Sequence, residues 1–512
     1  MAVVNPERSS PPQLLQQRVP ARWTVFSTAV LLLLLVSLWL RAGSPNRGEP
    51  LPAAVRPSSV AVLPFINTSP DAADDYLGAG LAAELTRGFK RLTGLQVSSR
   101  SSAFAPRQVT SDPRIAGRRM GVATVLLGTI RRSGDRLRVT TRLVDVEQGF
   151  DVWSETYERE TRELFEIEDE IRTAVAGALR VTSTADSTTR RRPTASFPAY
   201  DAYLAGCYQL EQLTPGSTRR AVAHFTHAVR LDSTFARAHA ALAEAYMRHG
   251  GVEAMSPLTA VPLARAAARR ALVLDSTLAE AHATLGTIAF GFDRSWRGAE
   301  VEFRRAVALE PGASELYQPY SRFLLAMGRI DGSRAASERA LQLSPLSPGL
   351  THHLGWHYLH ARQYDRARET LQHALELDST AWRVHVDLAL LEQASGNYPA
   401  AETHLGMALA AVPQRAEVQA ALGQLYALSG RTEDAKMVLR QLQVAATDRY
   451  VSPYLIAAVE AALGQRARAF ASLDQAVKER AAQVAYLRID LRVDPLRTDR
   501  RFLRLLRQLR LP

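Results

Sequence analysis

Cysteine is almost absent from this chain of 512 residues, because Cys207 is the only one. A lone cysteine excludes an intramolecular disulfide and a zinc site made of cysteines, and we expect Cys207 to be a buried helix residue. The Gly-x-x-x-x-Gly-Lys-Ser/Thr loop, the Gly-x-Ser-x-Gly elbow and the His-Glu-x-x-His pair are also missing. Gly78 and Gly80 imitate a dinucleotide-binding turn, but 12 residues separate Gly78 from Phe65, where the preceding strand should end. We therefore expect no enzymatic activity and no cofactor.

Lysine is scarce as well, since only three of the 63 basic residues are lysine and arginine supplies the rest. The formal net charge of +12 would suit a nucleic-acid partner. However, the arginines are spread through every segment together with aspartate and glutamate, which indicates solvated helix faces. We therefore expect no nucleic-acid partner.

What the sequence does contain is a period of 34 residues in its C-terminal half. The equivalent positions are Leu354, Leu388, Leu422 and Ile456; Gly355, Ala389, Gly423 and Ala457; Ala367, Ala401, Ala435 and Ala469; and Leu371, Leu405, Leu439 and Leu473. A fixed period in this range predicts a solenoid, in which each unit buries its apolar face against its neighbours. Helical spacing within each unit predicts two antiparallel helices. Such surfaces usually bind rather than catalyse.

These units resemble the tetratricopeptide repeat. The matching residues are Leu354, Gly355 and Tyr358 in one first helix, and Ala299, Phe303 and Ala306 in one second helix. The register predicts about eight repeats over residues 197–482. Nine extra residues between Tyr246 and Ala264 are expected to form a loop at one rim of the solenoid. Residues 483–512 are expected to cap the solenoid with a helix; a basic amphipathic helix on an anionic membrane is the alternative.

The tetratricopeptide register also predicts which residues line the concave groove. They are Arg322, His352, His353, Trp356, His360, Arg383 and Asp387. Such a groove suits an extended peptide or an acidic tail, because tryptophan supplies contact area and arginine binds carboxylates bidentately. The histidine spacing would also bring imidazoles within reach of one metal ion, but no cysteine or acidic residue on that helix completes a zinc site. We expect a peptide-binding groove and no metal; a solvated surface remains the alternative.

Before the repeats, residues 23–40 form an uncharged stretch that follows a 22-residue tail. As a helix it would extend roughly 27 Å, close to the ~30 Å hydrocarbon core of a bilayer. We expect a transmembrane helix followed by a Pro-rich tether over residues 41–57; a cleaved signal peptide is the alternative. This predicts a single-pass protein of the bacterial inner membrane with most of the chain in the periplasm. Arginines on both sides of the stretch leave the orientation open.

Residues 58–181 have the pattern of a small layered α/β domain. Strands are expected at residues 60–65, 95–98, 122–132, 136–145 and 150–157, and helices at residues 80–92, 114–120 and 164–179. The segments 60–65, 127–135 and 153–157 resemble the TolB amino-terminal-like domain. In that family the domain stands before tetratricopeptide repeats and is commonly fused to a nucleotide cyclase, a protein kinase or a winged-helix domain. A Ser/Thr/Arg linker over residues 182–196 would span about 20 Å, so the domains on either side need not be rigidly coupled.

The predicted fold is therefore an N-terminal transmembrane helix, a small α/β layered domain and a C-terminal all-α tetratricopeptide-repeat superhelix. We expect a membrane-anchored scaffold or adaptor that binds a peptide or a partner protein. The alternative is a regulatory or sensory subunit whose catalytic or DNA-binding output lies on another chain.

Overall fold

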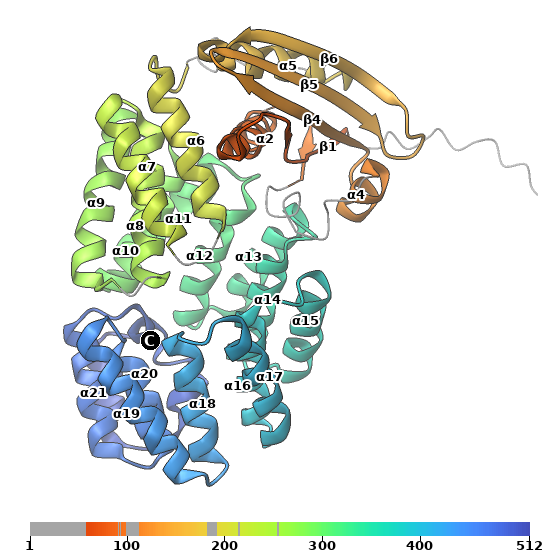
Figure 1. Cartoon of the computed structure of the whole chain (residues 1–512). Coiled ribbons are helices and arrows are strands. Elements are labelled where there is room, and N and C mark those ends of the chain that lie inside the picture. The colour runs from red at the N-terminus through yellow and green to blue at the C-terminus, as the bar shows by residue number, and fades with distance from the viewer. Residues whose placement is uncertain are drawn as a thin grey trace, which may run out of the picture. The chain divides into compact units, whose positions relative to one another are not determined.

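The computed structural model describes residues 58–90, 92, 94–98, 112–181, 192–212, 216–252 and 255–511, which belong to one compact unit (Figure 1). The expected tail, transmembrane helix and tether lie outside these residues, as does most of the expected linker. Within the described ranges, no helix is both long and apolar enough to cross a bilayer. The fold class is corrected accordingly to an α/β domain followed by helical repeats. The predicted single-pass inner-membrane location is not supported and is withdrawn.

The N-terminal part of the described chain is a mixed sheet covered by helices. Its elements are β1 (Ser59–Val62), β2 (Ile66–Asn67), η1 (Ala72–Asp74), α2 (Asp75–Phe89), β3 (Gln96–Val97), α4 (Pro113–Met120), β4 (Thr124–Ser133), β5 (Arg136–Asp145), β6 (Asp151–Glu160), η3 (Thr161–Glu163) and α5 (Leu164–Ala178). The strand order is β3-β1-β4-β5-β6, and the short β2 pairs with β4. β1 runs parallel to both neighbours, whereas β4, β5 and β6 are antiparallel.

The glycines that imitate a dinucleotide-binding turn lie inside α2, where they allow close packing. A Cβ atom on Gly78 would stand 2.1 Å from the Phe65 carbonyl oxygen. A Cβ atom on Gly80 would stand 2.9 Å from Leu204 Cδ2. Only glycine permits both approaches without a shift of the neighbouring atoms, so these residues serve packing.

The repeats follow as paired helices in the part of the chain that the structure describes. They are α6 (Phe197–Gln212), α7 (Ser217–Leu231), α8 (Ala236–Val252), α9 (Pro257–Leu274), α10 (Ala279–Ile288) with the π-helical turn η5 (Ala289–Asp293), α11 (Trp296–Leu309), α12 (Ser314–Ala326), α13 (Ile330–Leu343), α14 (Pro348–His360), α15 (Tyr364–Leu377), α16 (Trp382–Ala394), α17 (Tyr398–Ala411), α18 (Ala416–Leu428), α19 (Thr432–Asp448), α20 (Pro453–Ala462) and α21 (Arg466–Lys478). A Cβ atom on Gly355 would stand 2.7 Å from Leu371 Cδ2, which explains the small residue at this repeating position.

The nine extra residues between Tyr246 and Ala264 lengthen two helices instead of forming a rim loop. α8 continues to Val252, and α9 begins at Pro257. The Ser256 hydroxyl accepts a hydrogen bond from the amide of Leu258, and Pro257 occupies the first helical position, where a missing N–H costs nothing. The loop expected from the sequence included Pro257 and Pro262, whereas Pro257 begins α9 and Pro262 lies inside it.

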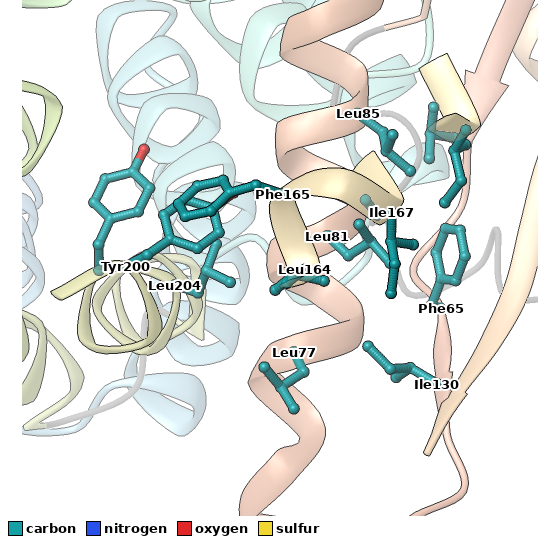
Figure 2. Packing of buried hydrophobic residues seen from close by; sticks show 14 of the residues in the cluster. Phe65, Leu77, Leu81, Leu85, Ile130, Leu164, Phe165, Ile167, Tyr200 and Leu204 are labelled. Carbon is teal, nitrogen blue, oxygen red and sulfur yellow. The ribbon is translucent and has the colours of Figure 1, made fainter. Parts of the chain in front are cut away.

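The α/β domain and the first repeat share one hydrophobic core, so the expected loose coupling is wrong for the described residues. Figure 2 shows Tyr200 and Leu204 of α6 next to Phe165 of α5. The Phe165 and Tyr200 ring centroids lie 4.2 Å apart, and both side chains are buried. We call this junction the N-terminal seam. Cys207 also lies in α6, but it is half-buried rather than fully buried.

Polar contacts reinforce the N-terminal seam. The Tyr76 hydroxyl donates to Asp201 Oδ1 at 2.6 Å, and the Tyr200 hydroxyl donates to Glu168 Oε1 at 2.7 Å. Burial, followed by the nearby charge of Glu84, raises the pKa of Glu168 well above its usual range. A buried carboxyl group that keeps a hydrogen-bond donor marks a fixed junction.

The residues after α21 do more than cap the array. They form η6 (Ala482–Tyr486), η7 (Leu491–Leu496) and α22 (Arg500–Gln508). Phe502 and Leu505 of α22 pack into the same core as Tyr454 and Phe470 of the last helical pair. The two short turns before α22, which the sequence prediction did not include, lie against the inner helices of the repeats. We call residues 482–497 the C-terminal segment.

Among the described residues, the non-glycine positions with positive φ are all arginines: Arg180, Arg294, Arg362, Arg480 and Arg510. Arg362 falls 34 residues from Gly328 and from Gly396, which share its left-handed conformation. Glycine adopts this conformation without strain, whereas other residues adopt it at a cost of about 1–2 kcal/mol. A compensating contact is therefore expected at the arginines.

Candidate functional site

The seven predicted groove residues lie on the first helices of three successive repeats. Arg322 belongs to α12; His352, His353, Trp356 and His360 belong to α14; and Arg383 and Asp387 belong to α16. The structure brings most of them into contact. The Arg322 guanidinium lies 5.2 Å from the Trp356 ring centroid, and His352 Nε2 lies 2.7 Å from Asp387 Oδ2.

His353 is fully buried and has a structural role. Arg322 Nε donates to its Nδ1 atom at 3.4 Å, so Nε2 carries the proton and donates to the Ser321 hydroxyl at 2.8 Å. Burial, helped by the charge of Arg322, lowers the pKa of His353 well below its usual range. The ring is therefore neutral and already uses both nitrogens.

A buried serine–histidine network that the sequence prediction missed continues from this point. Ser321 Oγ lies 2.7 Å from Ser337 Oγ, and Ser333 Oγ lies 2.8 Å from His357 Nδ1. Burial, followed by the charge of Arg334, lowers the pKa of His357 to about 4. The network joins α12, α13 and α14, and it is closed to solvent, so it holds the repeats together rather than contacting a partner.

Trp356 and His360 are covered by the C-terminal segment. The Tyr486 ring meets the Trp356 ring edge-on with centroids 5.6 Å apart. His360 Nδ1 lies 3.4 Å from the Ile489 carbonyl oxygen, and only 6% of His360 is exposed. The chain itself thus occupies this stretch of the predicted groove.

Asp490 anchors the C-terminal segment. Its buried carboxylate accepts hydrogen bonds from the Tyr454 hydroxyl at 3.0 Å and from Arg492 Nη2 at 2.6 Å. Although burial alone would raise its pKa, the charge of Arg492 and the hydrogen bonds from Arg492 hold that pKa well below its usual range. Gln424 Nε2 also donates to the Arg492 carbonyl oxygen at 3.0 Å. The segment is therefore an integral part of the folded array.

Two strained arginines also help to hold the C-terminal residues. Arg362 forms a bidentate pair with Asp494 at 2.6 and 2.8 Å, and Arg294 donates to the Val477 carbonyl oxygen at 3.1 Å. These contacts offset the cost of the left-handed backbone.

The accessible part of the predicted site centres on Arg383. Its side chain is exposed, and its guanidinium lies 4.4 Å from the Trp382 ring centroid, while that of Arg415 lies 5.2 Å from the same ring. Partial burial of the guanidinium, together with the charge of Arg415, lowers the pKa of Arg383 to about 10. No carboxylate of the described residues forms an ion pair with Arg383. We call Trp382, Arg383 and Arg415, together with Arg322 and the partly covered Trp356 next to them, the arginine–tryptophan surface.

The histidines do not assemble a metal site. In the described ranges, no group of three or more histidine, cysteine, aspartate or glutamate side chains is placed to hold a metal ion. His353 and His357 bond to serines, while His352 bonds to Asp387. Their close spacing along α14 therefore serves three separate polar contacts.

Comparison with known proteins supports the repeats. A family model for the tetratricopeptide repeat matches residues 358–425. A Rhizobium meliloti (strain 1021) protein named "Putative adenylate cyclase 3" is 33% identical over 201 residues, which are 39% of this chain and 34% of that protein. The match thus spans about a third of the length of this relative.

Solved structures of similar fold include Pseudomonas aeruginosa PilF and the human IFIT1 dimer with m7Gppp-AAAA. The PilF structure is 22% identical with a TM-score of 0.32, over 42% of this chain and 92% of that chain. The IFIT1 structure is 15% identical with a TM-score of 0.44, over 61% of this chain and 77% of that chain. The paired helices and the family match confirm the predicted tetratricopeptide repeats; the TolB resemblance of residues 59–179 stays a prediction.

Proposed function

We propose that this tetratricopeptide-repeat scaffold binds an acidic, extended segment of a partner protein through the arginine–tryptophan surface. The observation that carries the proposal is the Arg383 guanidinium, which is exposed on Trp382 and has no carboxylate partner among the described residues. An arginine that packs on an indole ring loses side-chain freedom, and its planar guanidinium can then bind a carboxylate with two hydrogen bonds.

The charges around Arg383 favour an acidic partner. Partial burial lowers the pKa of Arg383 most, and the charges of Arg415 and Arg322 lower it further, so the three guanidinium groups repel one another. Glu417, which is 3.5 Å from Arg415 Nε, offsets part of this charge, and Asp387 is engaged by His352. A ligand carboxylate would relieve the remaining repulsion.

The remaining predicted residues have positioning roles in this proposal. His353 stacks on Trp356 with ring centroids 5.7 Å apart and accepts a hydrogen bond from Arg322. The His360 ring also packs on Trp356, and the two ring centroids lie 4.5 Å apart. These contacts fix Trp356 and Arg322, whereas Arg383 and Trp382 are left for the partner.

The test measures binding of synthetic peptides to the full chain by fluorescence anisotropy. The peptides have equal length and equal aromatic content, and they carry a negative, a zero or a positive net charge. We expect the acidic peptide to bind most tightly, and Arg383→Gln to weaken that binding about tenfold, since a hydrogen bond to a charged group contributes about 1.5–3 kcal/mol. Arg440→Gln is the matched control, because Arg440 is an exposed arginine of α19 outside this surface.

Two results would contradict the proposal. One is equal binding of the three peptides, or an acidic-peptide affinity that Arg383→Gln leaves unchanged. The other is tighter binding of a single-stranded RNA oligonucleotide that is lost in Arg383→Gln, which would make the surface a polyanion site for nucleic acid.

A second candidate is a regulatory or sensory subunit whose output lies on another chain. Its support is the 201-residue similarity to a protein named as a cyclase, together with the TolB resemblance. We would purify the tagged full chain from its host after chemical cross-linking and identify bound chains by mass spectrometry. Recovery of a cyclase, kinase or DNA-binding chain that falls in Arg383→Gln would favour this role, whereas Arg383-dependent recovery of chains without such domains would favour the simple scaffold.

A further inference from the structure

A cavity of about 240 Å³ lies where early repeats meet late ones. One side comes from α9, α10 and η5, and the opposite side comes from the starts of α18 and α20 and from η6. The two sides are roughly 200 residues apart in sequence. The cavity shares Arg415 and Glu417 with the edge of the arginine–tryptophan surface, but it does not include Arg383 or Trp382, and the inference about it rests on Arg449 and Arg480.

The inner wall of the cavity is apolar and aromatic. Val261, Phe290, Leu455 and Tyr486 contribute to it. The Phe290 and Tyr486 rings pack edge-to-face with centroids 5.3 Å apart, and only 3% of Phe290 is exposed. Such a wall gains most from an aromatic or branched aliphatic body that stacks on these rings.

The rim of the same cavity is positively charged. Arg415, Arg449 and Arg480 line it, against a single carboxylate, that of Glu417. Arg449 Nη2 donates to the Gln414 carbonyl oxygen at 2.7 Å, and Arg480 Nη1 donates to the Phe292 carbonyl oxygen at 3.0 Å. Neither Arg449 nor Arg480 has an ion-pair partner among the described residues. Two guanidinium groups therefore keep donors for an anion.

Helix ends add to this positive field. Residues from the first turns of α9, α18 and α20 line the cavity, and each of these helices is at least ten residues long. The N-terminus of a helix carries a partial positive charge, which favours an anion.

We infer that this cavity is a binding site for a small monocarboxylic acid with an aromatic or branched apolar body. The body lies against Phe290 and Tyr486, and the carboxylate meets Arg449 and Arg480 at the rim. The volume lies below the ~300–1,000 Å³ of sites for larger ligands, so the ligand is small. Because the ligand would contact early and late repeats at once, its binding would also stabilise the contact between these repeats by mass action.

The test compares three probes that share one body and differ only in the end group: phenylpropionate, phenylpropanol and phenylpropylamine. Binding to the full chain is measured by isothermal titration calorimetry and by the shift of the melting temperature. We expect phenylpropionate to bind about tenfold more tightly than phenylpropanol, and phenylpropylamine to bind least, because a hydrogen bond to a charged partner adds about that factor.

Two variants locate the site. Thr287→Phe places a ring in the cavity from a half-buried lining residue and should abolish binding of all three probes. Arg449→Gln should leave phenylpropanol affinity unchanged and reduce the preference for phenylpropionate several-fold. Arg440→Gln, outside the cavity, should change neither value. Each variant is first checked for an unchanged circular dichroism spectrum.

The inference would be overturned by equal affinity for the acid and the alcohol, or by phenylpropionate binding that survives Thr287→Phe. If Thr287→Phe fails to fold, Arg449→Gln decides the question alone, since Arg449 is an exposed residue and its change leaves the core intact. An unchanged preference for the acid in Arg449→Gln would then count against the site.

Discussion

Two junctions of the repeat array with other parts of the chain, the N-terminal seam and the C-terminal segment, are built differently. At the N-terminal seam, aromatic and aliphatic side chains of α2, α5 and α6 merge into one core, with Tyr200 and Phe165 at its centre (Figure 2). At the C-terminal segment, buried apolar side chains such as Val484 and Leu496 are combined with polar anchors, namely the buried Asp490 carboxylate and several backbone carbonyl oxygens.

The N-terminal seam extends the hydrophobic core of the repeats, whereas the C-terminal segment covers part of their surface. The N-terminal seam continues the stacking of helices, so the α/β domain behaves as one more layer of the array. The C-terminal segment instead lies on the inner face of the repeats, where a partner was predicted to bind. A tetratricopeptide array can therefore look continuous in sequence and still have little of its inner face open.

The largest expected effect breaks the N-terminal seam. Tyr200→Ala removes a fully buried ring and leaves Glu168 without its donor, so the free energy of unfolding should fall by about 5 kcal/mol. Urea denaturation measures this loss, and hydrogen exchange should show faster opening of α2 and α5. The control Tyr200→Phe keeps the ring and should cost about 1–3 kcal/mol. A loss below about 1 kcal/mol in Tyr200→Ala would mean that the two domains are not rigidly joined.

A somewhat smaller effect is expected when the C-terminal segment is released. Asp490→Asn leaves the half-buried Arg492 without its charge partner, which should lower the free energy of unfolding by about 3 kcal/mol. The folded-state pKa of Asp490 is depressed, so its contribution is complete above the unfolded pKa of about 3.9 and is lost as the pH falls below that value. The stability of the variant should therefore fall less on acidification than that of the wild type. An unchanged urea midpoint at neutral pH would refute the anchoring role of Asp490.

The smallest effect is expected for His357, which lies in the repeats between the two junctions and contributes to the pH dependence of stability. The folded-state pKa of His357 is about 4, below its unfolded value of about 6.5, so the unfolded chain binds the proton first. Stability is complete above the unfolded pKa and falls with pH, by about 2 kcal/mol at pH of about 5. His357→Gln should flatten the stability profile between neutral pH and about pH 5. A slope identical to that of the wild type would exclude His357 as a source of this loss.

Local pattern was enough to predict the repeats. The 34-residue spacing placed the helices because each pair folds largely through contacts with its neighbours, and Gly355 marked a close approach that the structure shows. The same reasoning failed between Tyr246 and Ala264, because Pro257 stands at the start of α9, where proline is compatible with a helix, and Pro262 is accommodated inside α9. Contacts between distant parts, such as Leu204 against Gly80, have no local signature at all.

The candidate site was predicted only in part for the same reason. The register correctly put Arg322, Trp356 and Arg383 on first helices, but it could not show that Tyr486 would cover Trp356. A partial signal was present: the C-terminal segment carries apolar residues at positions 484, 487, 491, 493 and 496, and all of them are buried. The sequence could not show which surface these residues bury, because that depends on how the chain folds back onto the repeats.

The arginines with positive φ have a consequence for the redesign of such proteins. A consensus repeat derived from this chain would place glycine where Arg294 and Arg362 stand, as Gly328 and Gly396 do. That substitution would relax the backbone and would also remove the ties to Val477 and Asp494. The product would be a more regular array with a looser C-terminal segment and a more open inner face. Departures from an averaged repeat can thus mark the places where an array folds back on itself.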